Sequence, residues 1–215
     1  DFLPAARNGM RTLGMQVVQT GHVDKADAEA RAAYQKTGDK MTLVRKPSLS
    51  DPTSKAEALK TARKRAGDVN AIRPIAFNFG DEVAYAPNGL DYDFSPHALA
   101  EMREWLRTQY PSLDALNKEW GTTYKEWAEI VPSTSREAVQ SGRYARWADL
   151  RLFACRSMAQ FHEEVIEEMR KEAPKARYGL SGTQVPYPYN GMDWAQLAGV
   201  FDYHNNYGGG GELPH

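Results

Sequence analysis

Short apolar runs alternate with longer helical patterns along this sequence, and this order constrains the fold more than any other feature. Each run has the length of one β-strand, and the gaps are long enough for crossover connections that contain helices. Such an alternation predicts parallel strands with helices packed against them. The predicted strands are residues 15–20, 41–45, 74–79, 178–181 and 200–204.

The predicted helices lie between these strands. Asp24 is placed to cap a helix that runs to about residue 36, and Ser54 is placed to open the next one. Further helices are predicted at 96–109, 113–120 and 194–197. The longest helix is the best supported, because its apolar residues recur at steps of three and four and form one stripe. The stripe comprises Trp147, Leu150, Ala154, Met158, Phe161, Val165 and Met169.

Two architectures satisfy this order of elements, a doubly wound sheet and a (β/α)8 barrel. No G-x-G-x-x-G or Walker sequence follows a predicted strand, which disfavours a nucleotide-binding fold. A complete barrel usually needs about 250 residues, whereas this chain has 215 and begins at Asp1 rather than at a methionine. We therefore expect a single α/β domain over residues 1–215 that forms an incomplete barrel.

Composition excludes several classes of function. The formal net charge is -1, and without a dense basic face the sequence predicts no binding to nucleic acid or to an anionic membrane. No run reaches the roughly 18 apolar residues of a membrane span, and no signal peptide is visible. Cys155 is the single cysteine, so a disulfide within the chain and a cysteine-rich zinc site are both excluded. We expect no cofactor, while the compartment and the formation of a homo-oligomer stay open.

Polar side chains follow the predicted strands, at the edge where parallel α/β folds bind their ligands. Glu82 is the sharpest candidate, because an apolar strand delivers it to this edge and Val83 and Tyr85 lie beside it. Apolar neighbours raise the pKa of a carboxyl group, as a general acid requires. A solvated or helix-capping acidic pair with Asp81 is the simpler alternative. The residues predicted to bind substrate are His22, Arg45, Asp81, Gln184, His204, Asn205 and Tyr207.

Two further observations concern the ligand. Aromatic residues near the inferred edge, such as Tyr187 and Tyr189, suit a sugar, because sugar rings have apolar faces that stack on aromatic rings. A metal held by His204 together with Asp202, Glu82 and His22 is conceivable, as in a metal-dependent isomerase. However, no close ligand spacing such as H-E-x-x-H supports it, and we predict no metal site.

Three motifs between residues 77 and 132 carry a family resemblance. A strand ends in Gly-Asp-Glu at 80–82, a helix contains Met-Arg-Glu-Trp-Leu at 102–106, and Ser-Leu-Asp-Ala-Leu-Asn-Lys-Glu-Trp-Gly-Thr-Thr follows at 112–123. The last motif is the most specific. This segment resembles glycoside hydrolase family 42, the β-galactosidase family of a large clan of retaining (β/α)8 hydrolases. The resemblance extends over about residues 13–207.

The resemblance implies roles for the acidic pair. Glu82 matches the family's general acid/base at the end of strand four, and Asp81 stands where the family has an asparagine that bonds the sugar 2-hydroxyl. An aspartate accepts that hydrogen bond but cannot donate an amide one. The family's nucleophile is a glutamate at the end of strand seven. With Glu82 ending strand four, this segment would hold about strands two to six, so we expect the nucleophile outside it.

The sequence thus favours a retaining glycosidase that acts on β-galactosides or related β-linked sugars. Its two carboxyl groups would lie about 5 Å apart, as retention requires. Two alternatives stay open at this point: a non-catalytic carbohydrate-binding barrel and a metal-dependent sugar isomerase.

Overall fold

The computed structural model describes residues 12–18, 22–87, 89–182, 187 and 189–205. Within them, four strands form one sheet in sequential order: β1 (Thr12–Gly14), β2 (Ala76–Asp81), β3 (Arg177–Ser181) and β4 (Tyr203–Asn205). All neighbouring strands are parallel. The parallel sheet and its sequential order agree with the prediction, and they bring the carboxyl ends of the strands to one edge.

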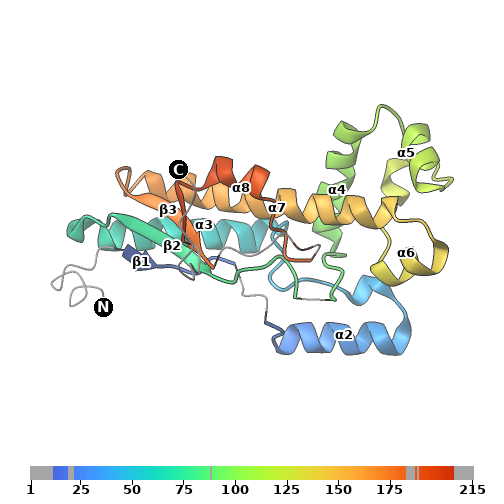
Figure 1. Cartoon of the computed structure of the whole chain (residues 1–215), viewed down its shortest axis with the longest axis horizontal. Coiled ribbons are helices and arrows are strands. Elements are labelled where there is room, and N and C mark those ends of the chain that lie inside the picture. Colours follow the sequence, from blue (N-terminus) through green and yellow to red (C-terminus); the bar gives the residue numbers. More distant parts are fainter. Residues whose placement is uncertain (1–11, 19–21, 88, 183–186, 188, 206–215) are drawn as a thin grey trace, which may run out of the picture.

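Helices connect the strands and extend beyond them (Figure 1). Their bounds are α2 (Lys25–Thr37), α3 (Pro52–Val69), α4 (Pro96–Gln109), α5 (Leu113–Trp120), α6 (Ser135–Ser141), α7 (Ala145–Arg170) and α8 (Trp194–Val200), with 3-10 turns at Lys40–Thr42, Asn70–Ile72 and Trp127–Glu129. The crossover helices are α3, α7 and α8, and α7 contacts both of the others. Helices α5 and α6 lie at the N-terminal end of α7, away from the sheet (Figure 1). The sheet with its crossover helices is one part of a barrel wall.

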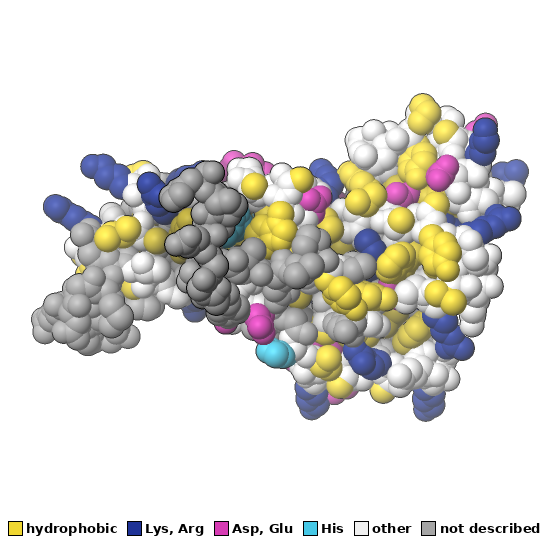
Figure 2. All heavy atoms as spheres, in the orientation of Figure 1, with side chains coloured by type: hydrophobic (Ala, Val, Ile, Leu, Met, Phe, Trp, Pro, Cys, Tyr) yellow, Lys and Arg dark blue, Asp and Glu magenta, His cyan; other side chains and the backbone are white. Residues whose placement is uncertain are grey.

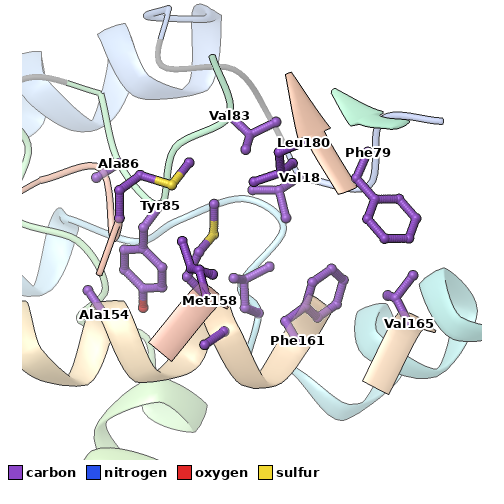
Figure 3. Packing of buried hydrophobic residues seen from close by; sticks show 14 of the residues in the cluster. Val18, Phe79, Val83, Tyr85, Ala86, Ala154, Met158, Phe161, Val165 and Leu180 are labelled. Carbon is purple, nitrogen blue, oxygen red and sulfur yellow. The ribbon is translucent and has the colours of Figure 1, made fainter. Parts of the chain in front are cut away.

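The two faces of the sheet differ in burial. Leu13, Phe77, Phe79, Tyr178 and Leu180 are buried on the face toward the helices, where Phe77 stacks on Tyr178 with ring centroids 5.5 Å apart. Figure 3 shows Phe79 and Leu180 packed with Phe161 and Val165 of α7. On the opposite face, Thr12, Asn78, Ser181 and Tyr203 are exposed or half-buried. In a (β/α)8 barrel this second face is the one that lines the interior.

Several helix boundaries agree with their local capping signals. Helix α2 begins after Asp24, whose carboxylate accepts a hydrogen bond of 2.8 Å from the Asp27 N–H, and the Asp27 side chain accepts one in return. Helices α4 and α5 have the predicted bounds and begin after Ser95 and Ser112. Helix α3 begins at Pro52 rather than at Ser54, because the Asp51 carboxylate provides its N-cap. No helix in the described part of the chain has the length and apolar character that crossing a membrane requires.

The strand predicted at residues 41–45 is absent from the described sheet. The Asp39 carboxylate accepts a hydrogen bond of 2.9 Å from the Met41 N–H and starts a 3-10 turn there. The Leu43 carbonyl accepts a bond of 2.9 Å from the Phe94 N–H, so the backbone pairs with a loop. A short buried apolar run can belong to either kind of element, and periodicity alone does not separate them. That prediction was wrong.

The first and last predicted strands are also displaced. Strand β1 ends at Gly14, although the Met15 N–H still bonds the Asn78 carbonyl at 2.6 Å. Strand β4 begins at Tyr203, because α8 continues to Val200. If β2 is the fourth strand of the barrel, its neighbour β1 is the third. The described sheet therefore corresponds to strands three to six, rather than two to six as predicted.

His162 of α7 is a buried ionisable group behind the sheet. Its ring lies against Phe79, Phe161 and Phe201, and its Nδ1 is 2.8 Å from the Met158 carbonyl oxygen. Since a carbonyl only accepts, Nδ1 carries the proton. Burial lowers the pKa of His162 to about 4. The imidazole is therefore neutral in the folded chain at neutral pH.

We expect this histidine to make stability depend on pH. The unfolded chain binds a proton at His162 near the ordinary pKa of about 6.5, whereas the folded chain does so only near pH 4. The free energy of unfolding should therefore be fully retained above pH 6.5 and should fall by about 3 kcal/mol between pH 6.5 and 4. Urea unfolding of the wild type and of His162→Leu across this range measures the difference. An equally steep fall in the variant would contradict the assignment to His162.

Candidate active site at the carboxyl edge of the sheet

The acidic pair lies at the carboxyl edge of the sheet. Asp81 is the last residue of β2 and pairs with Ser181, which in turn pairs with Asn205 of β4. Residues paired in adjacent parallel strands point to the same side of the sheet. The Asp81 and Ser181 side chains therefore project from the barrel-facing side, and Glu82 follows directly after Asp81.

Glu82 meets His22 from the loop after β1. Its Oε2 lies 3.5 Å from the His22 Nε2, and the side chains are 47% and 80% exposed. Figure 2 shows a histidine side chain beside an acidic one at the surface, next to the start of α2. Two residues predicted from separate strand ends are thus brought together. Val83 and Tyr85 are fully buried, whereas the Glu82 side chain is 47% exposed, so the apolar enclosure expected around its carboxylate is not formed.

The end of β2 is irregular just before Glu82. The register between β2 and β3 shifts between Asn78 and Asp81, Gly80 has a φ of 130° and Glu82 a φ of 50°. The Asn78 Oδ1 accepts a hydrogen bond of 3.0 Å from the Gly80 N–H, and its Nδ2 donates to the Ser181 Oγ. The sequence analysis missed Asn78. The available signal was a lone amide side chain inside an apolar strand.

Arg45 is buried rather than presented at a strand end. It is 1% exposed, its Nε donates to the Tyr85 carbonyl at 2.8 Å, and its Nη1 donates to the Pro47 carbonyl. Burial lowers the pKa of its guanidinium. The prediction that Arg45 faces the cavity of Glu82 is corrected: residues 41–45 are not a strand, and the side chain instead holds the loop after β2.

A cavity of about 340 Å³ lies beside Arg45 and includes Gln16, Ser48 and Lys55 in its lining, but not Glu82. It lies between the chain after β1 and the start of α3. The cavity is therefore separate from the acidic pair.

His204 lies at the predicted end of the sheet but on the other face. It pairs with Leu180, whose side chain is buried on the side toward the helices. Its ring lies edge-on to Trp194 of α8, with centroids 4.6 Å apart, and burial lowers the pKa of its imidazole. The expectation that His204 shares a cavity with Glu82 is wrong, because neighbouring residues of a strand point to opposite faces.

Three other predicted residues cannot be compared with the geometry. Gln184 and Tyr207 lie outside the described residues, and so does the side chain of Asn205. Among the residues that the structure describes, no group of three or more histidine, cysteine and carboxylate side chains is arranged to hold a metal ion.

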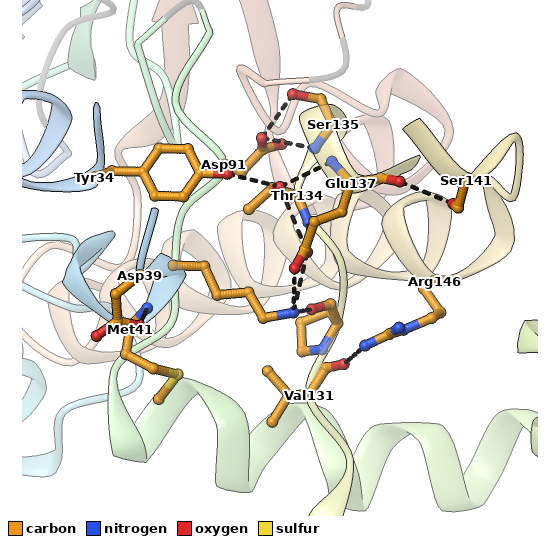
Figure 4. A network of polar contacts seen from close by, with 12 residues as sticks. Tyr34, Asp39, Met41, Asp91, Val131, Thr134, Ser135, Glu137, Ser141 and Arg146 are labelled. Carbon is orange, nitrogen blue, oxygen red and sulfur yellow. Dashed lines mark hydrogen bonds and ion pairs between the residues drawn. The ribbon is translucent and has the colours of Figure 1, made fainter. Parts of the chain in front are cut away.

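A polar network fixes the long connection from β2 to α7 (Figure 4). One Asp91 carboxylate oxygen accepts hydrogen bonds from the Ser135 N–H and Oγ at 2.8 and 2.7 Å, and the other accepts one from Trp147 Nε1 at 2.7 Å. Lys40 pairs with Glu137 at 3.0 Å. Buried hydrogen bonds of this kind hold a loop in one conformation, so the chain that leaves Glu82 is well anchored.

The fold and site together define part of the wall of a (β/α)8 barrel, with an acidic pair at its carboxyl edge. The family model for glycoside hydrolase family 42, described as β-galactosidase, matches residues 60–208. The chain belongs to this family, so the resemblance seen in the sequence and the barrel prediction are both confirmed.

One curated relative is similar in sequence, and two solved structures are similar in fold. The β-amylase of Bacillus cereus is 25% identical over 141 residues, which are 65% of this chain and 24% of that protein. The β-galactosidase of the Antarctic haloarchaeon Halorubrum lacusprofundi superposes with a TM-score of 0.67 at 13% identity, covering 95% of this chain and 32% of that one. An exo-carrageenase of the same family from Bacteroides ovatus gives a TM-score of 0.60 at 16% identity, covering 92% and 32%. The chain thus spans a quarter to a third of the length of these relatives.

Proposed function

We propose that the protein carrying this chain is a retaining glycosidase that acts on β-galactosides or related β-linked sugars, with Glu82 as its general acid/base. The observation that carries the proposal is the position of Glu82. It directly follows β2 at the carboxyl edge of a parallel sheet, in a chain of glycoside hydrolase family 42. In barrel enzymes, catalytic residues come from this edge.

The reaction would proceed in two steps. Glu82 gives its proton to the glycosidic oxygen while a second carboxylate, from outside this chain, attacks the anomeric carbon and forms the glycosyl-enzyme. The Glu82 carboxylate then takes a proton from water, which attacks the anomeric carbon and releases the second carboxylate. Glu82 is solvent-accessible, as both proton transfers require.

The neighbours of Glu82 would bind the sugar. Asp81 accepts a hydrogen bond from a sugar hydroxyl, for which the family's asparagine suggests the 2-hydroxyl. His22, 3.5 Å from Glu82, is placed to donate to the carboxylate or to a hydroxyl group of the substrate. The same proposal includes three residues at the ends of the next strands. Gln184 follows β3 in the sequence, Asn205 is the last residue of β4, and Tyr207 comes two residues later.

A non-catalytic carbohydrate-binding barrel is the second candidate. The presence of Asp81 in place of the family's asparagine favours it, because an aspartate places a second negative charge beside the acid/base and cannot donate the amide hydrogen bond.

The stereochemistry of the product tests the proposal. When the complete protein cleaves an aryl β-galactoside, we expect proton NMR to detect the β-anomer of galactose first, because two inversions give net retention. The α-anomer should grow in only as the sugar mutarotates. An α-anomer at the earliest times would show an inverting enzyme. Sugar binding by calorimetry without any cleavage would support the binding barrel instead.

A further inference from the structure

We infer that Asn78 is a positioning residue for Glu82, because its side-chain amide holds the irregular end of β2 from which Glu82 projects. The inference rests on the proposed role of Glu82. It adds a residue that would act through the acid/base without touching the substrate.

The irregularity is a bulge in β2. Pairing with β3 is regular up to Asn78 and Gly179, and it resumes with Asp81 and Ser181. Between these pairs, two residues of β2, Phe79 and Gly80, therefore lie opposite one residue of β3, Leu180. A bulge leaves the extra residue outside the regular ladder and re-aims the side chains that follow. Here the side chain that follows directly is Glu82.

The Asn78 amide ties this bulge together at two points. Its Oδ1 accepts from the Gly80 N–H at 3.0 Å, and its Nδ2 donates to the Ser181 Oγ on the neighbouring strand. Gly80, with a φ of 130°, is in a backbone conformation that favours glycine. A Cβ there would lie 2.8 Å from Val83 Cγ1. The amide therefore stabilises a bend that the backbone does not adopt readily.

Glu82 needs such support, because its own φ of 50° is positive. A residue without the freedom of glycine keeps this conformation only when its surroundings hold it there. Asn78 is on the same side of β2 as Asp81. Their partners Gly179 and Ser181 are two residues apart on β3 and therefore face the same side of the sheet. The amide thus lies on the barrel-facing side, below the acidic pair and away from the apolar core.

The chemistry of the amide explains why an asparagine suits this position. The two contacts require one acceptor and one donor at the same time, and an amide provides both. An aspartate keeps the acceptor for Gly80 and lets the Ser181 hydroxyl donate instead. An alanine keeps neither contact. Asn78→Asp should therefore retain more of the positioning of Glu82 than Asn78→Ala does.

The test compares two substrates of the complete protein that differ in their need for an acid. Lactose has a poor leaving group, whereas a dinitrophenyl β-galactoside has a good one that departs with little protonation. For Asn78→Ala we expect kcat/KM on lactose to fall about tenfold to hundredfold, since small displacements of a catalytic group have effects of this size. On the activated substrate we expect a loss of at most about threefold. Asn78→Asp should show a smaller loss, again confined to lactose.

Controls separate positioning from general damage. Ile75→Ala changes a residue that precedes β2 and is 54% exposed, and the ratio of the two kcat/KM values should stay at the wild-type value. Equal losses on both substrates for Asn78→Ala would overturn the inference and leave Asn78 a purely structural residue. If Asn78→Ala fails to fold, Asn78→Asp decides by the same ratio, and an unchanged ratio overturns the inference.

The failure of the proposed function gives a different result. A wild type that cleaves neither substrate would remove the role of Glu82 and the inference with it. A second outcome would overturn only the inference about Asn78. In it the wild type cleaves both substrates, and Glu82→Gln loses kcat/KM on lactose alone, but neither Asn78 variant shows such a selective loss.

Discussion

Replacement of Glu82 by glutamine in the complete protein should reduce kcat/KM for lactose by about 10²–10⁴-fold, the usual contribution of general acid catalysis. The amide keeps the shape of the carboxyl group but has no proton to transfer. With a dinitrophenyl β-galactoside, formation of the glycosyl-enzyme should survive, because that leaving group departs with little protonation. Steady-state kinetics on the two substrates measures the difference.

Azide should restore turnover of the activated substrate by Glu82→Gln. This anion attacks the glycosyl-enzyme without a general base, so it replaces the second function of the carboxylate. Glu104→Gln, on an exposed carboxylate of α4 that is 73% accessible, is the matched control and should show neither the loss nor the rescue. Equal losses on both substrates without azide rescue would mean that Glu82 is not the acid/base, and the carbohydrate-binding reading would then be preferred.

Replacement of Phe79 by alanine should lower the free energy of unfolding by about 3–5 kcal/mol, the usual range for a fully buried phenylalanine. Phe79 is 0% exposed, and its ring contacts Tyr178, His162 and Phe201 at centroid distances of 6.0, 6.0 and 6.2 Å. Its removal leaves a cavity between the sheet and α7 that these rings can fill only in part. Urea unfolding followed by circular dichroism measures the change.

The control for this prediction is Val139→Ala on α6. Val139 is 67% exposed, and a surface change of this kind should stay within about 0.5 kcal/mol. A Phe79→Ala variant as stable as the wild type would show that the β2–α7 contact is not part of the stabilising core. A change in the denaturant slope would instead point to a change in the unfolded state.

Local signals in the sequence were sufficient for several elements. Helices α4 and α5 have the predicted bounds, and Ser95 and Ser112 provide their N-caps, since a cap acts only on the turn that follows it. The long apolar stripe predicted α7, and Leu150, Ala154, Met158, Val165 and Met169 within it are all 0% exposed. Strands β2 and β3 were found because each is a short apolar run between turn-forming residues.

Other features depend on partners that are distant along the chain. The run that ends at Arg45 has the composition of a strand, but the Leu43 carbonyl accepts from the Phe94 N–H, and the Arg45 side chain donates to the Tyr85 carbonyl. Both partners come from the loop after β2: Tyr85 is 40 residues after Arg45 and Phe94 is 51 residues after Leu43. A pattern of apolar residues contains no record of which backbone groups will meet, so only the tertiary structure decides between a strand and a buried loop.

The candidate site divides in the same way. The sequence by itself determined that Asp81 and Glu82 end an apolar strand, and parallel strands then bring them to the edge where the loop with His22 also begins. The tertiary structure decided that His22 comes within 3.5 Å of Glu82, that His204 turns toward the helices, and that Asn78 braces the bulge. The physical reason is that successive side chains along a strand point to opposite sides of the sheet. A shift of the strand by one residue, or the insertion of one bulge, therefore turns a side chain to the other side. Such a displacement is set by pairing between strands, which a single strand's sequence does not specify.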